Sequence, residues 1–202
     1  MQLQDLLFLE NFLNLKKLIF FLKNICKAEK FYRILKKFKL SKMENSLNKI
    51  IVKKEQKLIE LKKTISIEYL KEKINENKNF INFKEKIENN IINNKISLIA
   101  EIKKASPSAG IIIKDYNPVY IAKKYYENKA TCLSVLTEED FFQGNLIHIH
   151  NIKQKINLPI LCKDFFIDPF QVHLAKSYGA DAILIILAGV TKKIANELYE
   201  NA

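Results

Sequence analysis

From residue 96 onward, short apolar runs alternate with longer segments in which apolar and charged residues are mixed. Apolar runs of this length, bounded by turn-forming residues, are typical of buried strands, and the longer segments are typical of helices. The expected pairs of strand and helix are 97–103 with 118–127, 131–136 with 146–155, 159–163 with 169–178, and 182–187 with 191–199. This alternation predicts an α/β fold with a parallel sheet and right-handed crossovers.

The first half of the chain has a different composition. All four glycines and all four prolines of the 202-residue chain lie after residue 100. A segment without these helix breakers, rich in Leu, Lys, Glu and Ile, is most simply helical. We therefore expect three parts: a basic helical extension over residues 1–42, a helical segment over 43–95, and the alternating region over 96–202.

The charge of the chain is as uneven as its glycine and proline content. Almost all of the net charge of +12 lies in the first 95 residues, and such a basic segment can bind nucleic acid or a membrane surface. However, Arg33 is the only arginine, and arginine is the usual side chain for reading phosphates and bases. The excess of Lys, Asn, Ile and Phe instead resembles the drift of an AT-rich genome. We expect no nucleic-acid partner.

Two interpretations of residues 1–42 remain open. Their basic charge and many Leu and Phe side chains are compatible with an amphipathic helix at a membrane or a partner. The alternative, which we favour, is that these residues lie upstream of a natural start at Met43 and are not native to the protein. The longest apolar run in this part, 18–22, is far too short to span a bilayer, and we expect no membrane partner.

The cysteine and histidine residues do not suggest a disulfide framework or a metal site. The three cysteines, Cys26, Cys132 and Cys162, form no Cys-x-x-Cys pair, which predicts reduced thiols in the cytoplasm. His148 and His150 are two residues apart on an expected helix, so they point to different faces. We therefore expect a cytoplasmic protein without a metal.

Charged residues stand at the ends of two of the expected strands. Glu101 and Lys103 are two residues apart and share one face of the first strand, and Lys163 closes the third. Charged groups at the carboxyl ends of parallel strands are how a βα barrel builds an active site. Glu101 is informative by itself, because a carboxylate within an apolar strand is costly unless it is paired. Lysine is so abundant here that Lys163 alone would more simply be a surface residue.

Five ordered motifs carry a resemblance to a known family. They are AEIKKASPS at 100–108, LSVLTEE at 133–139, FQG at 142–144, LCKDF at 161–165 and GAD at 179–181. Together they resemble indole-3-glycerol phosphate synthase, the enzyme of tryptophan biosynthesis that closes the indole ring. The similarity begins near Leu47, and the stretch 160–171 resembles most the form fused to phosphoribosylanthranilate isomerase.

The resemblance implies a lyase that converts 1-(2-carboxyphenylamino)-1-deoxy-D-ribulose 5-phosphate into indole-3-glycerol phosphate, carbon dioxide and water, without a cofactor or metal. It assigns catalytic roles to three residues. Lys163 would be the general acid that protonates the substrate carbonyl as the ring closes. Lys103 would bind and orient the anionic groups of the substrate. Glu101 would hold these lysines and polar substrate groups in place.

Three further residues would bind substrate. Ser106 lies in the loop after the first strand, where it can hydrogen-bond the substrate. Phe142 and Phe165 resemble the aromatic walls that enclose the anthranilate ring, and a flat aromatic substrate gains from such walls. Without the surrounding motifs, both phenylalanines would be assigned to the core.

The resemblance also implies the TIM (βα)8-barrel fold, of which the chain has only the first four βα units after its helical extension. The general base and the phosphate loops of the family come from the other half. We therefore expect this chain, a fragment, to need a second polypeptide carrying the missing half-barrel, or an isomerase domain, as partner. The alternative is an inactive truncated remnant or a half-barrel that serves only for assembly.

Overall fold

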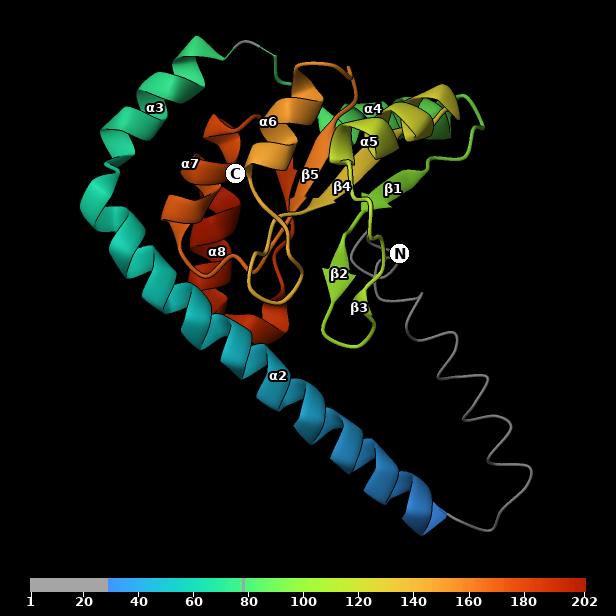
Figure 1. Ribbon diagram of the computed structural model, residues 1–202, viewed down its shortest axis with the longest axis vertical. Coiled ribbons are helices and arrows are strands. Elements are labelled where there is room, and N and C mark those ends of the chain that lie inside the picture. Colours follow the sequence, from blue (N-terminus) through green and yellow to red (C-terminus); the bar gives the residue numbers. More distant parts are fainter. Residues whose placement is uncertain (1–28, 78) are drawn as a thin grey trace. The chain divides into compact units, whose positions relative to one another are not determined.

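The computed structural model describes residues 29–77 and 79–202, and the chain divides into two compact units, Met1–Leu47 and Asn48–Ala202. In the first unit the described backbone is helical and belongs to α2 (Glu29–Thr64), which continues into the second unit (Figure 1). Most of the expected extension over 1–42, together with Cys26, lies outside the described residues. The second unit holds every element that positions the site.

The second unit is built around a four-stranded parallel sheet. Its strand order is β1-β4-β5-β6. Each of these strands therefore lies beside the parallel strand that follows it in the chain. The strands are β1 (Ile99–Ile102), β4 (Cys132–Leu136), β5 (Ile160–Lys163) and β6 (Ala182–Ile183). A small antiparallel hairpin, β2 (Ala105–Ser106) with β3 (Gly110–Ile111), follows β1. The α/β class and the parallel sheet predicted from the alternation are therefore confirmed.

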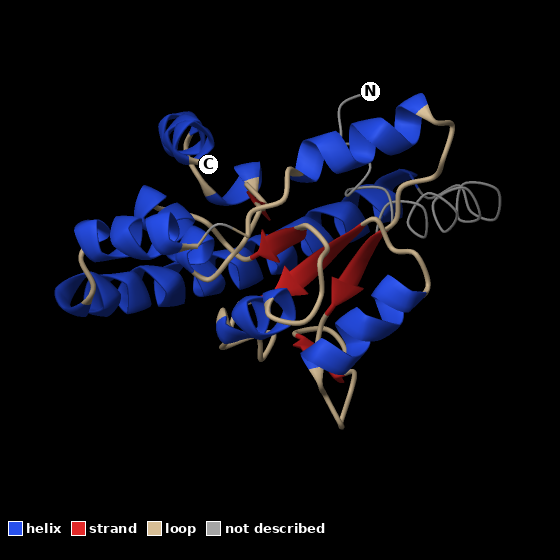
Figure 2. Ribbon diagram, turned by 90° about the horizontal axis from the view of Figure 1, so that it is seen from above, coloured by secondary structure: helices blue, strands red, loops and turns tan. Residues whose placement is uncertain are grey.

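Helices flank the strands, which Figure 2 shows in red among blue helices. The crossover helices are α5 (Pro118–Glu127), α6 (Ile147–Lys153) and α7 (Pro169–Ser177), and α8 (Lys192–Asn201) follows β6. Before the sheet come α3 (Ile67–Glu76) and α4 (Phe83–Ile92). Side-chain oxygens of Asn117, Asp168 and Thr191 accept the first free backbone N–H groups of α5, α7 and α8, as N-cap residues do.

The predicted bounds differ most at the last strand. The expected strand over 182–187 is wrong beyond Ile183, because the ladder ends there and Leu187–Gly189 forms the 3-10 helix η1. An apolar run can form a strand only where a neighbour supplies backbone partners. In the described sheet, β5 offers β6 only the pairs Leu161 with Ala182 and Cys162 with Ile183.

One face of the sheet forms the core. Side chains alternate along each strand, and one set packs against the crossover helices. The strand residues of this core face are Ala100, Ile102, Leu133, Val135, Ile160 and Cys162. Helix residues that complete the cluster include Ala122, Ile149, Ile152, Val172, Ala175 and Leu198. The other face carries Glu101, Ser134 and Lys163, so the charged residues predicted for a site point away from the core.

A buried carboxylate stabilises the opposite end of the sheet, where the amino-terminal ends of the strands lie. The side chain of Asp181 is fully buried and forms an ion pair with Lys153 of α6, with 2.5 Å between Nζ and Oδ2. Asp181 also accepts the backbone N–H groups of Ile160, at the start of β5, and of Ile81, in the segment before α4, each at 2.7 Å. Asp181 therefore fixes the start of β5 and ties it to α6.

No helix in the described parts of the chain combines the length and the apolar character needed to cross a membrane.

Replacing Asp181 with Ala should lower the free energy of unfolding by about 3 to 5 kcal/mol, because it leaves the buried ammonium of Lys153 without its carboxylate partner. Urea denaturation followed by circular dichroism measures the change. Asp115→Ala, at an exposed position, is the control and should stay within about 0.5 kcal/mol of the parent chain. Equal stability of the two variants would contradict the assigned role of Asp181.

Candidate active site

The three charged residues predicted from the strand ends lie together. The Glu101 carboxylate, on β1, accepts a hydrogen bond from Lys103 through Oε2 at 2.5 Å and one from Lys163 through Oε1. Lys163 lies on β5, two strands away in the sheet, so the parallel order brings it to Glu101. All three side chains are about 30 % exposed. The cluster is therefore open enough to meet a ligand.

The charges of the cluster stabilise the ionised form of Glu101. Partial burial disfavours a charged carboxylate, but the hydrogen bonds from Lys103 and Lys163 and their positive charges outweigh it. The pKa of the Glu101 carboxyl is consequently held below its usual value. With one carboxylate between two ammonium groups, the cluster keeps a net charge of about one positive unit at neutral pH, which suits an anionic ligand.

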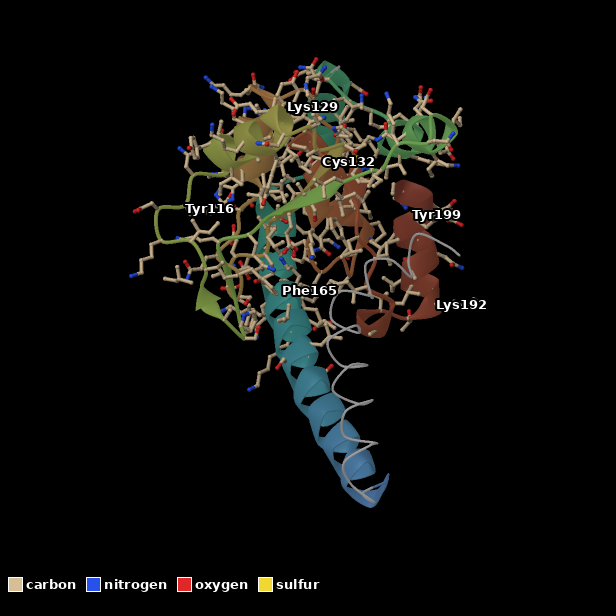
Figure 3. All side chains as sticks on the ribbon, turned by 90° about the vertical axis from the view of Figure 1, so that its right-hand side faces the viewer. Tyr116, Lys129, Cys132, Phe165, Lys192 and Tyr199 are labelled. Atoms are coloured by element: carbon tan, nitrogen blue, oxygen red, sulfur yellow. The ribbon has the colours of Figure 1, made fainter. Side chains whose placement is uncertain are left out.

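The two phenylalanines predicted as aromatic walls also meet. The ring centroids of Phe142 and Phe165 lie 6.1 Å apart with the planes tilted by 39°, and both side chains are half-buried. Figure 3 labels Phe165, just past β5, and Cys132, at the start of β4; the two lie toward opposite ends of the sheet. Phe165 thus lies at the carboxyl ends of the strands, directly after Lys163 and Asp164 in the sequence.

The loop that carries Phe142 is held by a buried carboxylate. Glu138, only 1 % exposed, accepts the backbone N–H groups of Asp140, Phe141 and Phe142 at 2.7 to 3.1 Å. Gly144 closes the loop, with its N–H donating to the Glu138 carbonyl at 2.7 Å. A Cβ at position 144 would lie 2.4 Å from the carbonyl oxygen of Leu136, so only glycine fits this close approach.

Ser106 lies in the β2–β3 hairpin that follows β1. Its Oγ accepts the backbone N–H of Ala109 at 3.2 Å and lies 3.4 Å from the Ser108 Oγ. It is half-buried, whereas Ser108 is exposed. No hydrogen bond between Ser106 and the Glu101 cluster is found in the described part of the chain.

A set of residues missed by the sequence analysis lines a cavity beside the site. Lys54 of α2 forms an ion pair with Asp164 at 2.6 Å, and Thr137 donates to the same carboxylate at 2.8 Å. These three residues, with Leu58, Cys162 and Phe166 among others, line the cavity between α2 and the carboxyl ends of β4 and β5. The available signal was weak: Lys54, Lys57, Leu58 and Leu61 have the spacing of one helix face, but lysines occur on every face of α2.

Further lysines of α2 bind the loops of the site. Lys57 pairs with Glu139 at 2.8 Å and Asp140 at 2.7 Å, in the loop of Phe142. Burial disfavours the charged amine, but these hydrogen bonds outweigh it and raise the pKa of Lys57. Lys62 pairs at 2.5 Å with Asp168, the N-cap residue of α7. The sequence analysis attributed the excess of lysine to the base composition of the genome, but Lys57 and Lys62 form ion pairs with carboxylates of the site loops.

His148 contacts an aromatic side chain. The ring of His148 meets that of Tyr116 edge-on, with 5.5 Å between centroids. Burial, with the charge of Lys104, lowers the pKa of His148, and burial raises the pKa of Tyr116 to about 12. Within residues 29–77 and 79–202, no group of three or more His, Cys, Asp or Glu side chains is placed to hold a metal ion.

Comparison with known proteins gives one family. The family model described as indole-3-glycerol phosphate synthase matches residues 47–202. A relative of that name from Trichodesmium erythraeum is 44 % identical over 148 residues, covering 73 % of this chain and 49 % of its own length. Similar relatives are those of Alkaliphilus metalliredigens (44 % identical, 73 % and 55 %) and Aliarcobacter butzleri (42 % identical, 77 % and 59 %). The chain thus spans about half the length of the curated relatives it matches.

Glu101→Gln should make the free energy of unfolding less dependent on pH in the acidic range. Because the folded pKa of Glu101 is lowered, its contribution to stability is present above the unfolded pKa and is lost as pH falls through the folded pKa. At pH 7 the variant should be less stable than the parent chain by roughly 1 to 2 kcal/mol, and the difference should shrink toward pH 3. Urea midpoints measured from pH 7 to pH 3 test this.

The control for this prediction is Glu72→Gln, at an exposed position of α3. It should follow the parent chain at every pH. A gap between Glu101→Gln and the parent chain that stays constant down to pH 3 would show that the carboxylate does not hold the two ammonium groups.

Proposed function

Since the chain belongs to the indole-3-glycerol phosphate synthase family, we propose that it supplies the acid-bearing half of that enzyme's active site. The reaction is conversion of 1-(2-carboxyphenylamino)-1-deoxy-D-ribulose 5-phosphate into indole-3-glycerol phosphate, carbon dioxide and water. The observation that carries the proposal is the Glu101 carboxylate shared by Lys103 and Lys163 at the carboxyl edge of the sheet. This edge is where βα barrels bind and transform substrates.

The charged cluster fits the chemistry of ring closure. In the proposed step, Lys163 gives a proton to the substrate carbonyl oxygen as the new carbon–carbon bond forms, and its ammonium becomes a neutral amine. Lys103 stays charged and binds an anionic group of the substrate. Glu101 keeps both lysines in place through the hydrogen bonds that it accepts from them.

The uncharged residues fit the shape of the substrate. Phe142 and Phe165, with ring centroids 6.1 Å apart, form an apolar wall for the anthranilate ring. Ser106, in the hairpin after β1, can hydrogen-bond the sugar or phosphate portion when that loop meets the substrate. The proposed ring-closure step uses no cofactor, because its one transferred proton comes from the Lys163 ammonium.

We further propose that the sheet is the first half of a (βα)8 barrel and that additional polypeptide supplies the rest. In the described sheet, β1 and β6 each pair with one neighbour, so both retain a free edge. A barrel closes such edges with further strands. The free and buried thiols of Cys132 and Cys162 support a reducing, cytoplasmic location.

The same free edges favour a second candidate function, a half-barrel that assembles with a partner but does not catalyse. The two candidates differ in one result. Both predict that the chain binds a polypeptide carrying the complementary half-barrel, whereas only the first predicts formation of the indole product by the complex.

Lys163→Ala should lower turnover at least 100-fold, because general acid catalysis contributes about that much or more. The chain is combined with the second half of the Trichodesmium erythraeum relative, and indole formation is followed by fluorescence. Lys155→Ala, at an exposed position after α6, is the control and should retain turnover. Turnover near the parental level in the Lys163→Ala complex would reject the assigned acid, and assembly without turnover by the parent would favour the second candidate.

We also propose that residues 1–42 are dispensable for the second unit, since the family match begins only at residue 47. A chain that begins at Met43 should keep its cooperative thermal transition, with a midpoint within about 4 °C of the full chain. Circular dichroism melting compares the two. Loss of the cooperative transition would make the extension a structural part of the fold.

A further inference from the structure

A lysine of α2 is buried against the strand end that carries Lys163. The Nζ of Lys54 lies 2.6 Å from Oδ1 of Asp164, and the two side chains are only 12 % and 9 % exposed. By contrast, Lys63 on the same helix pairs with Glu60 in a bridge whose side chains are 63 % and 70 % exposed. The Lys54–Asp164 pair is thus a desolvated pair that joins α2 to β5.

Hydrogen bonds extend from this pair to the two peptide groups that follow Lys163 in the chain. Oδ1 of Asp164 accepts the N–H of Phe165 at 2.7 Å, and Oδ2 accepts the hydroxyl of Thr137 at 2.8 Å. The N–H of Thr137 in turn donates to the carbonyl of Lys163 at 3.1 Å. Asp164 and Thr137 therefore fix the backbone directly after Lys163, at the 163–164 and 164–165 peptide groups.

Stability alone does not explain a lysine at position 54. Desolvating two charges costs about as much as their attraction returns, and apolar replacements of buried pairs are often as stable or more so. What a buried pair does supply is a defined geometry, because an ammonium and a carboxylate with further hydrogen bonds tolerate few arrangements. That geometry would matter where a neighbouring side chain must reach one position.

We propose that Lys54 is a positioning residue: through Asp164 and Thr137 it fixes the strand end from which Lys163 reaches Glu101. The value of this placement for ring closure rests on the proposed function, but the placement itself does not. The backbone N–H of Phe165 is held by the same carboxylate. Asp164 therefore positions both the proposed general acid, Lys163, and the aromatic side chain of Phe165. A displacement of about 1 Å at a reacting group can cost as much as 100-fold in rate.

The test observes the ammonium group of Lys163 in the full 202-residue chain. Lysine ¹⁵N NMR near pH 6 detects ion-paired ammonium groups, and Lys163→Arg identifies the signal. Lys54→Met should shift or broaden the Lys163 signal, whereas Lys54→Arg should restore it. Lys63→Met, which removes the same charge from an exposed position of α2, is the matched control and should leave the signal unchanged.

A double variant separates placement from stability. The double variant Lys54→Met with Asp164→Asn also removes the Asp164 charge, which is left unpaired and buried in Lys54→Met. It should recover most of the thermal stability lost in Lys54→Met, while the NMR signal of Lys163 should stay altered. A parental Lys163 signal in this double variant would overturn the proposal. Loss of the fold in both variants would also overturn it, because the pair would then be required for folding rather than for placement.

Turnover distinguishes failure of this inference from failure of the proposed function. In the complex with the complementary half-barrel, Lys54→Met should lower kcat by 10- to 100-fold with little change in KM, and Lys54→Arg should recover most of it. An altered Lys163 signal with no turnover even by the parent complex would leave the placement standing and reject the function. Parental turnover together with a parental signal in Lys54→Met would reject the placement.

Discussion

The site depends on one carboxylate placed between two ammonium groups. Glu101 stands within an otherwise apolar strand, where a lone charge would be costly, and Lys103 and Lys163 compensate it. Lys103 comes from the next position on the same face, but Lys163 arrives only through the parallel order β1-β4-β5. The carboxylate on β1 therefore requires an ammonium group from β5, and the register of the parallel sheet brings Lys163 within reach of Glu101.

The same principle operates at both edges of the sheet, with different consequences. At the amino-terminal edge, Asp181 and Lys153 are almost fully buried and hold the start of β5, which favours stability. At the carboxyl edge, the side chains of Glu101 and Lys163 remain about 30 % exposed. A βα fold places function at the carboxyl edge, and the difference in burial follows this division.

The loops at the carboxyl edge are held in advance of any ligand. Glu138 fixes the turn that carries Phe142, and Gln171 donates to the carbonyl of Phe165 at 2.9 Å while its Oε1 accepts the N–H of Ile167 at 2.7 Å. Lys57 adds ion pairs from α2. Prepared loops of this kind reduce the ordering needed when a ligand binds.

The sequence by itself determined the strand and helix pairs, because hydrophobic period and capping residues are local: α5 begins at Pro118 and ends at Glu127 as predicted. It also predicted Glu101 and Lys163 as site residues, and the structure brings these two side chains together. It could not show that β6 ends at Ile183, since a strand needs a partner. It could not show the contact of Lys54 with Asp164 either, because lysines occur all round α2 and only packing decides which one is buried. Such pairings between residues far apart in the chain were decided by the tertiary structure alone.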